Sequence, residues 1–458
     1  MKQHVIGFLI VVSVLLTSAD ARAQSDMNIL HDTGIHGGVI VHLGCGDGTL
    51  TASLRQSDSY CVHGLDADPK NVDRARKHVH ERGLYGGISI DSFNGRDLPY
   101  MDNMVNLLIA DKLGLVSQAE VMRVLAPGGV ALINGRKSVK SRPDNIDEWT
   151  HYLHDADNNA VAEDTVVGPP RRLQWQAGPK WTRHHDHMSS FSAMVSTGGR
   201  LFYIIDEGST ASLYMPSHWA LIARDAFNGK VLWKRKIDSW YTRFKGLKDG
   251  PADAPRRLIA AEDLVYTTLR LEGPVTSLDA ATGKTVRTYQ NTVGAEEILL
   301  SEGDLFVLIG PGSIGEGGRK ERPVEIRTIM AIDARAGNKL WQSSDVVAGG
   351  TMAADGQHVY YFNFDSRRAN CLNRKTGEVE WTSNPLPSPK RQTSFFSSKL
   401  VVQDGIVLFA GGEFSGMTKS GGVRTERTRS PQCRWKREKR YGQRNTLHPV
   451  TAPLKTYS

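Results

Sequence analysis

Three glycines and one carboxylate near the start of the chain have the types and spacing of a nucleotide site. Residues 39–50 read VIVHLGCGDGTL, so an apolar run leads directly into Gly44, Gly46 and Gly48. Glycine lets the backbone turn with positive φ and approach a ligand closely. Asp66 lies eighteen residues after Gly48, where a carboxylate can accept hydrogen bonds from both hydroxyls of a ribose. We predict that these four residues bind a cofactor; no residue stands out as catalytic.

The elements that would position these residues alternate between strand and helix. Strands are expected at 39–44, 59–68, 87–93, 105–111 and 130–134, and helices at 49–55, 71–83 and 118–129, the last closed by Pro-Gly-Gly. Such alternation favours an α/β, doubly wound parallel sheet. Ligands of such sheets bind at the carboxyl ends of the strands, where the glycines and Asp66 lie.

This stretch resembles the class I S-adenosylmethionine-dependent methyltransferases over roughly a quarter of the chain. LGCGDG is similar to their cofactor loop, GLDADPKNVDRAR to their second strand and helix, and VMRVLAPGGVALI to a late helix and strand. The resemblance implies a Rossmann-like fold and S-adenosylmethionine as cofactor, with Asp66 in the ribose position.

The chain also departs from that pattern. His42 stands where the family usually has an acid, Asn106 where an Asp is common, and after Ile133 the pattern ends without the last two strands. One alternative is therefore a retained fold that binds the cofactor poorly or not at all.

The first residues indicate export. Lys2 and His4 precede an apolar run from Val5 to Leu16, and Ala21-Arg22-Ala23 fits a cleavage site. We predict a signal peptide over 1–23, no stable membrane span and a periplasmic or extracellular location; the alternative is an uncleaved anchor. S-adenosylmethionine is made in the cytosol, so export would separate a cofactor site from its ligand.

At 458 residues the chain is too long for one ordinary core. We expect a methyltransferase-like domain over 24–150 and an irregular join over 151–192, dense in Trp, His and Asp. Two clusters in the join could collect a cation: His151, His154, Asp155 and Asp157, and His184, His185, Asp186 and His187. Neither has a known metal spacing, so we expect hydrogen-bonded packing and assign no metal.

Repetition dominates residues 193–422. ARDAFNGKVLW, SLDAATGKTVR, AIDARAGNKLW and CLNRKTGEVEW recur with their Asp or Asn anchors 54, 54 and 40 residues apart. Each predicts a hairpin with glycine at a positive-φ turn position (Gly229, Gly283, Gly337 and Gly377). Two hairpins per period make a four-stranded sheet, and such sheets stack radially as a propeller. We expect Trp233, Trp341 and Trp381 to fill gaps between the blades.

The motif resembles the PQQ-like repeat of quinoprotein alcohol dehydrogenases and of cofactor-free relatives such as outer-membrane assembly propellers. Those dehydrogenases carry adjacent cysteines beside pyrroloquinoline quinone (PQQ), plus a calcium site. The four cysteines here (Cys45, Cys61, Cys371 and Cys433) are scattered, so we do not expect PQQ. Cys45 and Cys61 could form a disulfide, although two buried thiols are favoured.

Residues 423–458 break the repeat inside a fifth unit, leaving the propeller incomplete. They carry ten Lys or Arg against two Glu, a surplus equal to the whole net charge of +8. The rest of the chain is near neutral, which argues against a nucleic-acid partner. This basic tail is either a natural extension or the product of a frameshift, which we favour because the break falls within a blade.

Three functions follow from these patterns. The first is an exported binding or scaffold protein with a protein, peptide or glycan ligand at the propeller face. The second is an active S-adenosylmethionine-dependent methyltransferase. The third is a quinone-dependent oxidoreductase.

Overall fold

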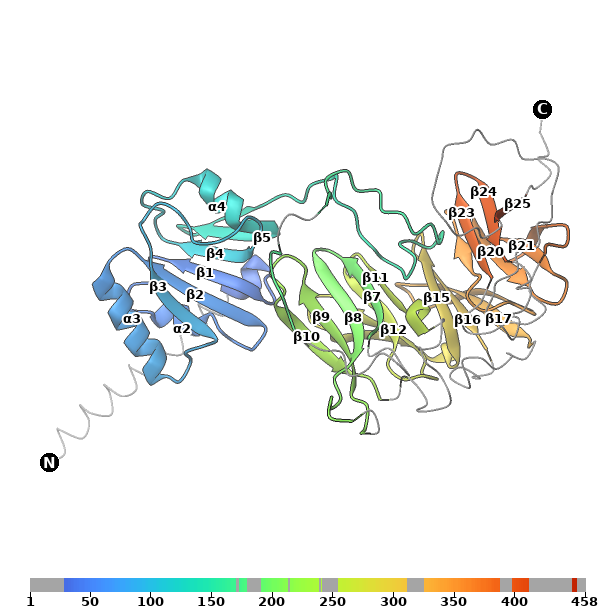
Figure 1. Ribbon diagram of the computed structural model, residues 1–458, viewed down its shortest axis with the longest axis horizontal. Coiled ribbons are helices and arrows are strands. Elements are labelled where there is room, and N and C mark those ends of the chain that lie inside the picture. Colours follow the sequence, from blue (N-terminus) through green and yellow to red (C-terminus); the bar gives the residue numbers. More distant parts are fainter. Residues whose placement is uncertain are drawn as a thin grey trace, which may run out of the picture.

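The structure is a computed structural model, and it describes residues 29–169, 173–178, 191–212, 215–238, 240, 254–310, 325–387, 398–411 and 447–450. A helix-containing α/β domain lies at one end, and antiparallel sheets follow one another in an arc toward the other end (Figure 1). The expected signal peptide, the His184–His187 cluster and Cys433 lie outside the described residues.

The first domain is a single six-stranded sheet in the order β3-β2-β1-β4-β5-β6. Strands β1 to β5 are parallel and β6 is antiparallel to β5. The elements are β1 (Gly38–Leu43), α2 (Thr49–Ser53), β2 (Tyr60–Asp66), α3 (Pro69–Glu81), β3 (Ile88–Ser92), β4 (Val105–Ala110), α4 (Gln118–Val124), β5 (Leu125–Ile133) and β6 (Arg136–Val139). The α/β Rossmann-like prediction is confirmed.

Two details of the first domain differ from prediction. Helix α4 ends at Val124 instead of at Pro-Gly-Gly, because Leu125 already pairs with Val105 and the segment from Leu125 to Gly129 continues as strand. The expectation that the sheet lacks its last two strands is wrong by one strand, since β6 follows Ile133 through a tight turn with Asn134 and Gly135 at positive φ.

In the described residues of the second part, there are four four-stranded antiparallel sheets and one three-stranded sheet. The first two are β7 (Phe191–Thr197), β8 (Arg200–Asp206), β9 (Trp219–Asp225), β10 (Val231–Lys236) and β11 (Leu258–Ala261), β12 (Leu264–Thr268), β13 (Val275–Asp279), β14 (Thr285–Tyr289). The next two are β15 (Ala295–Ser301), β16 (Asp304–Ile309), β17 (Arg327–Asp333), β18 (Lys339–Asp345) and β19 (Ala353–Ala354), β20 (His358–Asn363), β21 (Arg368–Asn373), β22 (Val379–Thr382). The last is β23 (Lys399–Gln403), β24 (Ile406–Ala410) and β25 (Leu447–Val450).

We call these sheets blades 1 to 5. The first strands of successive blades contact one another, from β7 through β11, β15 and β19 to β23, as blades around an axis require. The strand β25 lies in the predicted basic tail and pairs with β24, while the tail's origin stays a prediction.

The repeated turn glycines have the predicted conformation. Their φ angles are 73° at Gly229, 69° at Gly283, 80° at Gly337 and 72° at Gly377. In each turn, the glycine N–H donates to the backbone oxygen of the Asp or Asn anchor four residues earlier. A left-handed turn of this kind favours glycine because it has no Cβ.

Trp233 and Trp341 join successive blades as predicted. A Cβ at Gly283 would lie 2.6 Å from the Trp233 ring, and the Trp233 Nε1–H donates to the Ala280 oxygen at 3.0 Å. Trp341 repeats this contact on Gly377, donating to the Arg374 oxygen at 2.7 Å. Both tryptophans lie near the start of the fourth strand of their blades.

The join supplies one more copy of the same contact. Trp175 packs on Gly229 of blade 1, and its Nε1–H donates to the Ala226 oxygen at 3.0 Å. Trp175 therefore takes the place that the tryptophan of a preceding blade would take, so the join covers the free side of blade 1.

Candidate cofactor site

The glycine-rich loop lies at the carboxyl end of β1, next to the end of β2. Gly44 N–H and Cys45 N–H donate to the Leu65 oxygen at 2.7 and 3.1 Å, which ties the loop to the neighbouring strand. Gly44, Gly46 and Gly48 all have positive φ, at 75°, 57° and 81°. The structure therefore places the predicted site residues at the sheet edge where ligands of such folds bind.

The three glycines have different surroundings. A Cβ at Gly48 would lie 2.9 Å from both Cα and Cβ of Ala75, so Gly48 lets helix α3 pack against the loop. A Cβ at Gly44 or Gly46 would meet nothing within 4 Å. The backbone of these two residues thus borders open space that a cofactor could enter. We call this space beside Gly44 and Gly46 the cradle.

Asp66 ends β2 and is buried, with 7% of its surface exposed. Its Oδ2 accepts from Gly46 N–H at 3.0 Å and from Asn71 Nδ2 at 3.1 Å, and its Oδ1 accepts from Asp68 N–H at 2.9 Å. Burial raises the pKa of Asp66, but these hydrogen bonds outweigh it and leave the pKa below its ordinary value.

The Asp66 carboxylate is thus largely occupied by donors of the protein itself. A carboxylate has about four lone-pair positions, and three hydrogen bonds from the chain leave about one for a ligand. Bidentate binding of a ribose would need at least one of these bonds to break. The carboxylate ties the glycine loop to the end of β2 through Gly46 N–H.

Neither of the two residues that depart from the family pattern, His42 and Asn106, lies in the cradle. His42 is 8% exposed, and its Nδ1 is hydrogen-bonded to Thr51 Oγ1 at 2.8 Å inside the domain. Asn106 lies near the amino end of β4, at the edge opposite the glycine loop. These residues contribute to packing and to a contact with blade 1.

Sequence reasoning missed two residues near the loop. Asn71 fixes Asp66, and its position five residues later, on the exposed start of α3, was the available signal. Asp111 directly follows β4, and because Leu43 pairs with Ala110, it lies beside Gly44. Asp111 is an exposed acid directly after the strand that neighbours β1.

Cys45, within the glycine loop, resembles a structural thiol. Cys45, Cys61 and Cys371 are free, so the disulfide alternative between Cys45 and Cys61 is wrong. Cys45 is buried under the loop, and burial raises the pKa of its thiol to about 12. Cys45 is therefore a packed side chain and a poor nucleophile.

The amino edge of the sheet is attached to blade 1. Asn106 Nδ2 donates to Asp225 Oδ2 at 2.7 Å, and Asn106 Oδ1 accepts from Asn228 Nδ2 at 2.7 Å. Asn228 Nδ2 also donates to the Met104 oxygen at 3.0 Å, and Ser59 Oγ donates to the Leu232 oxygen at 2.5 Å. The cradle's sheet and the first blade therefore share a polar interface.

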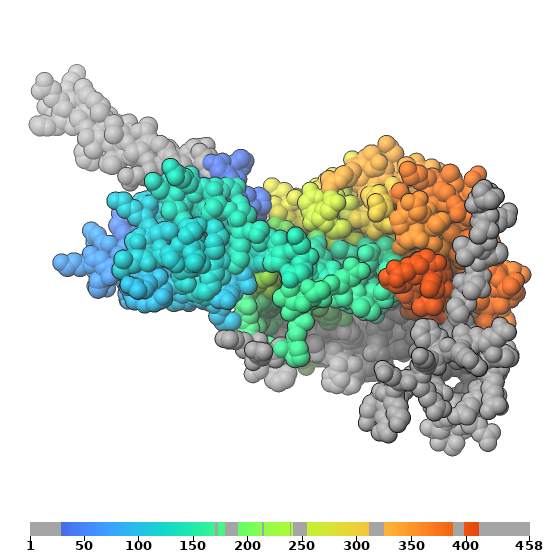
Figure 2. Space-filling model, turned by 90° about the horizontal axis from the view of Figure 1, so that it is seen from above, coloured from blue at the N-terminus to red at the C-terminus, as the bar shows by residue number. Residues whose placement is uncertain are grey.

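A short strap, residues 149–158, begins two residues before the expected join and hydrogen-bonds to the first strand of each described blade. The Trp149, Thr150, Ala156 and Asp157 oxygens accept from Ser196, Ala260, Ala354 and Val402 N–H at 2.7, 3.0, 2.8 and 2.9 Å. His151 Nε2 accepts from Leu300 N–H at 3.1 Å. Figure 1 shows this segment running over the sheets, and Figure 2 shows it crossing the surface from the first domain toward blade 5.

The first histidine cluster of the join has the expected hydrogen-bonded packing. His154 Nε2 lies 2.7 Å from Asp147 Oδ2, and Asp157 Oδ1 accepts from Asn159 N–H at 2.7 Å. Burial lowers the pKa of His151 to about 4, which keeps its ring neutral and able to accept from Leu300. The cluster packs the strap on the blades rather than one domain on another. A small cavity beneath it is lined by residues that include Tyr152 and Arg256.

Comparison with known families agrees with this geometry. Residues 40–129 match a family described as "Methyltransferase domain", and residues 325–453 match one described as "Outer membrane protein assembly factor BamB". The chain joins a methyltransferase-like Rossmann domain to PQQ-like propeller repeats. No curated protein matches it.

Solved structures similar to the chain include three that each cover about a quarter of it. A putative S-adenosylmethionine-dependent methyltransferase of Methanococcus maripaludis is 23% identical, with a TM-score of 0.24, over 25% of this chain and 55% of that one. The [4+2]-cyclase SpnF is 23% identical, with a TM-score of 0.23, over 25% and 44%. A putative sarcosine dimethylglycine methyltransferase of Galdieria sulphuraria is 21% identical, with a TM-score of 0.22, over 25% and 46%. The chain thus spans about half the length of each.

Proposed function

We propose that the chain is an exported binding or scaffold protein, in which the methyltransferase-like domain caps the propeller and the propeller face carries the ligand site. The strap is the observation that carries this proposal. Hydrogen bonds tie residues 149–157 to the first strand of each of the five described blades. Such a connection stabilises an open array of blades, whose free edges would otherwise be exposed.

The proposed capping role of the methyltransferase-like domain rests on contacts at the free side of blade 1, away from blade 2. Trp175 covers Gly229, and Asn106 reaches Asp225, which is 4% exposed. Burial raises the pKa of Asp225, while the hydrogen bond from Asn106 acts in the opposite direction. The methyltransferase-like domain is thus built into the end of the propeller.

The expected ligand of the propeller face is a protein, peptide or glycan. Export through residues 1–23 is part of this proposal, and the BamB-like match over 325–453 favours an envelope setting. Among the described residues, no helix is long and apolar enough to cross a membrane. Mass spectrometry of the chain secreted by a bacterial host tests export: we expect a mature amino terminus at Gln24, and an uncleaved chain contradicts it.

Calorimetry with S-adenosylmethionine and the full chain tests the role of the cradle. Gly46, Asn71 and Asp68 already donate hydrogen bonds to the Asp66 carboxylate. We therefore expect no saturable heat at about 1 mM cofactor, which means that the binding free energy is less favourable than about −4 kcal/mol. One-to-one binding followed by methyl transfer would contradict a purely structural cradle.

The second candidate function is an active methyltransferase. It is favoured by the open space beside Gly44 and Gly46 and by the exposed Asp111 at the end of β4. In this case Gly44, Gly46, Gly48 and Asp66 hold S-adenosylmethionine. An Asp66→Ala variant separates the two functions. A cofactor role predicts loss of binding, whereas the structural role predicts a destabilisation of about 1–3 kcal/mol with no binding to lose.

The third function, quinone-dependent oxidoreduction, has less support. No two cysteines of the chain are adjacent. Reconstitution of the purified chain with PQQ and calcium, followed by dye reduction, tests it; we expect no reduction above the apo-protein rate.

A further inference from the structure

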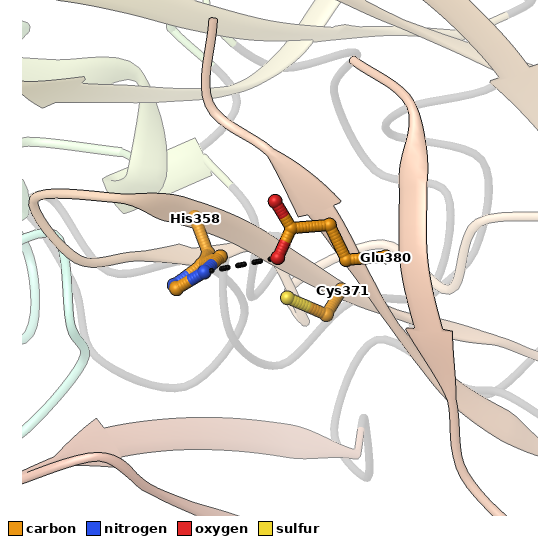
Figure 3. Close-up of side chains that lie close together, drawn as sticks. All are labelled: His358, Cys371 and Glu380. Atoms are coloured by element: carbon orange, nitrogen blue, oxygen red, sulfur yellow. Dashed lines mark ion pairs between the residues drawn. The ribbon is translucent and has the colours of Figure 1, made fainter. Parts of the chain in front are cut away.

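We infer that blade 4 contains a binding site for a divalent transition-metal ion of the zinc type, formed by His358, Cys371 and Glu380. Their potential ligand atoms all lie within 4.8 Å of one another. Figure 3 shows the three side chains pointing toward a common point from neighbouring strands. This site is separate from the cradle and independent of the proposed function.

The backbone explains how three strands bring these side chains together. His358 begins β20, Cys371 lies in β21 and Glu380 lies in β22. Leu372 pairs with Val379 and Cys371 with Trp381, so Glu380 is the extra residue of a β-bulge. A bulge redirects a side chain, and here it brings Glu380 to the face that carries His358 and Cys371.

The other blades provide an internal comparison. The strand pairing equates His358 with Arg200, Leu264 and Asp304, each opposite the Asp or Asn anchor of its blade. Blade 4 alone among the four complete blades has ligand-type residues at all three positions.

The positions equivalent to Cys371 and Glu380 also lack metal-ligand residues in the other complete blades. In blades 1, 2 and 3, the position of Cys371 is taken by Ala223, Ser277 and Ala331, and the position of Glu380 by Leu232, Val286 and Leu340. The fold of a blade therefore does not need the cysteine or the glutamate.

The imidazole is held as a metal ligand would be. His358 Nδ1 lies 3.3 Å from Asp355 Oδ1, while Nε2 lies 3.2 Å from Glu380 Oε2 and faces the cluster. Asp355 is itself fixed by Tyr360 OH and by the N–H groups of Gln357 and His358, each at 2.7 Å. A carboxylate on the far nitrogen is the usual partner of a histidine that binds zinc.

The carboxylate is positioned in a similar way. Asn373 Nδ2 donates to Glu380 Oε1 at 2.7 Å, which leaves Oε2 directed at His358. The donor set of one nitrogen, one sulfur and one oxygen suits zinc, and a thiolate and a carboxylate neutralise its two charges. The Cys371 proton leaves to solvent when the metal binds.

The site has an entry route. Cys371 is fully buried, but the side chains of His358 and Glu380 are 30% and 36% exposed. Three protein ligands leave a fourth tetrahedral position, which solvent water can fill from this side.

Titration of the reduced full chain with Co²⁺ tests the site. Co²⁺ substitutes for Zn²⁺ in such sites. It gives a near-ultraviolet charge-transfer band only where a cysteine thiolate is one of its ligands. We expect one equivalent of Co²⁺ to produce this band and Zn²⁺ to abolish it. We expect Cys371→Ala to lose it, and Cys45→Ala and Cys433→Ala to retain it.

Two further variants separate ligation from folding. Glu380→Leu introduces the leucine that blades 1 and 3 have at the equivalent position. The variant should therefore fold, as judged by an unchanged melting curve, but bind Co²⁺ much more weakly. Asp355→Asn should weaken Zn²⁺ binding about 10–100-fold without removing the thiolate band. No band in the wild-type chain, or a band that survives Cys371→Ala, would overturn the assignment.

Discussion

At the scale of single residues, the glycine loop shows two distinct reasons for the same residue type. Gly46 and Gly48 both have positive φ, but only Gly48 has a helix against the place of its missing Cβ, with Ala75 at 2.9 Å. The spacing of the glycines was enough to predict their place at the sheet edge. It was not enough to distinguish a residue that borders open space from one that packs against α3.

This distinction predicts unequal effects of two similar substitutions. Gly46→Ala adds only the cost of a left-handed backbone, about 1–2 kcal/mol. Gly48→Ala adds the collision with Ala75, about 1–3 kcal/mol more. Denaturant unfolding of the two variants measures the difference, and equal losses would show that the loop does not pack on α3 as described.

His151 predicts a dependence of stability on pH. Burial lowers its pKa to about 4 from the ordinary 6.5, so the unfolded chain takes up a proton between these pH values and the folded chain does not. Its contribution is complete above pH 6.5 and is lost as the pH falls toward about 4, at a cost on the order of 3 kcal/mol.

The matched variant is His151→Gln, whose amide oxygen can accept from Leu300 N–H but does not titrate. The unfolding free energy of the wild type, minus that of the variant, should fall by on the order of 3 kcal/mol as the pH is lowered from 6.5 to about 4. Parallel pH profiles would show that His151 is not held neutral in the fold.

At the scale of elements, the repeats were the most predictable part of the chain. Asp anchors, turn glycines and tryptophans at fixed spacing specify hairpins, and the four complete blades follow them. The strap was not predicted. Its carbonyl groups bind the blades through backbone hydrogen bonds, which leave no periodic signal in the side chains.

The contact between Trp233 and Gly283 can be isolated by comparison with Gly303. Both glycines have positive φ, at 69° and 79°, but only Gly283 has a tryptophan ring against it. Gly303→Ala should cost about 1–2 kcal/mol. Gly283→Ala should cost about 1–3 kcal/mol more, because Trp233 has to move.

Chemical denaturation of these two variants is the measurement, with the tryptophan emission spectrum as a second readout. The emission of Gly283→Ala should shift as the Trp233 ring leaves its place, and that of Gly303→Ala should not. Equal stabilities and equal spectra would contradict blade-to-blade docking through the tryptophans.

At the scale of the whole molecule, the sequence predicted two kinds of fold but not how they are joined. Asn106 was taken as a departure from a cofactor pattern, yet it binds Asp225 of blade 1. Trp175 was taken as part of an irregular join, yet it covers Gly229. Both contacts link residues more than fifty positions apart, and no local pattern encodes them.

The central claim is that the methyltransferase-like domain and the propeller form one structural unit. All nine tryptophans of the chain follow residue 148, whereas the α-helices described are all in the first domain. Tryptophan fluorescence therefore reports the strap, the join and the propeller. Far-ultraviolet circular dichroism at the helical minimum reports mainly the first domain. Thermal unfolding of the full chain followed by both signals tests the claim most directly. The two curves should coincide in one transition; two separated transitions would show independent domains and contradict the account.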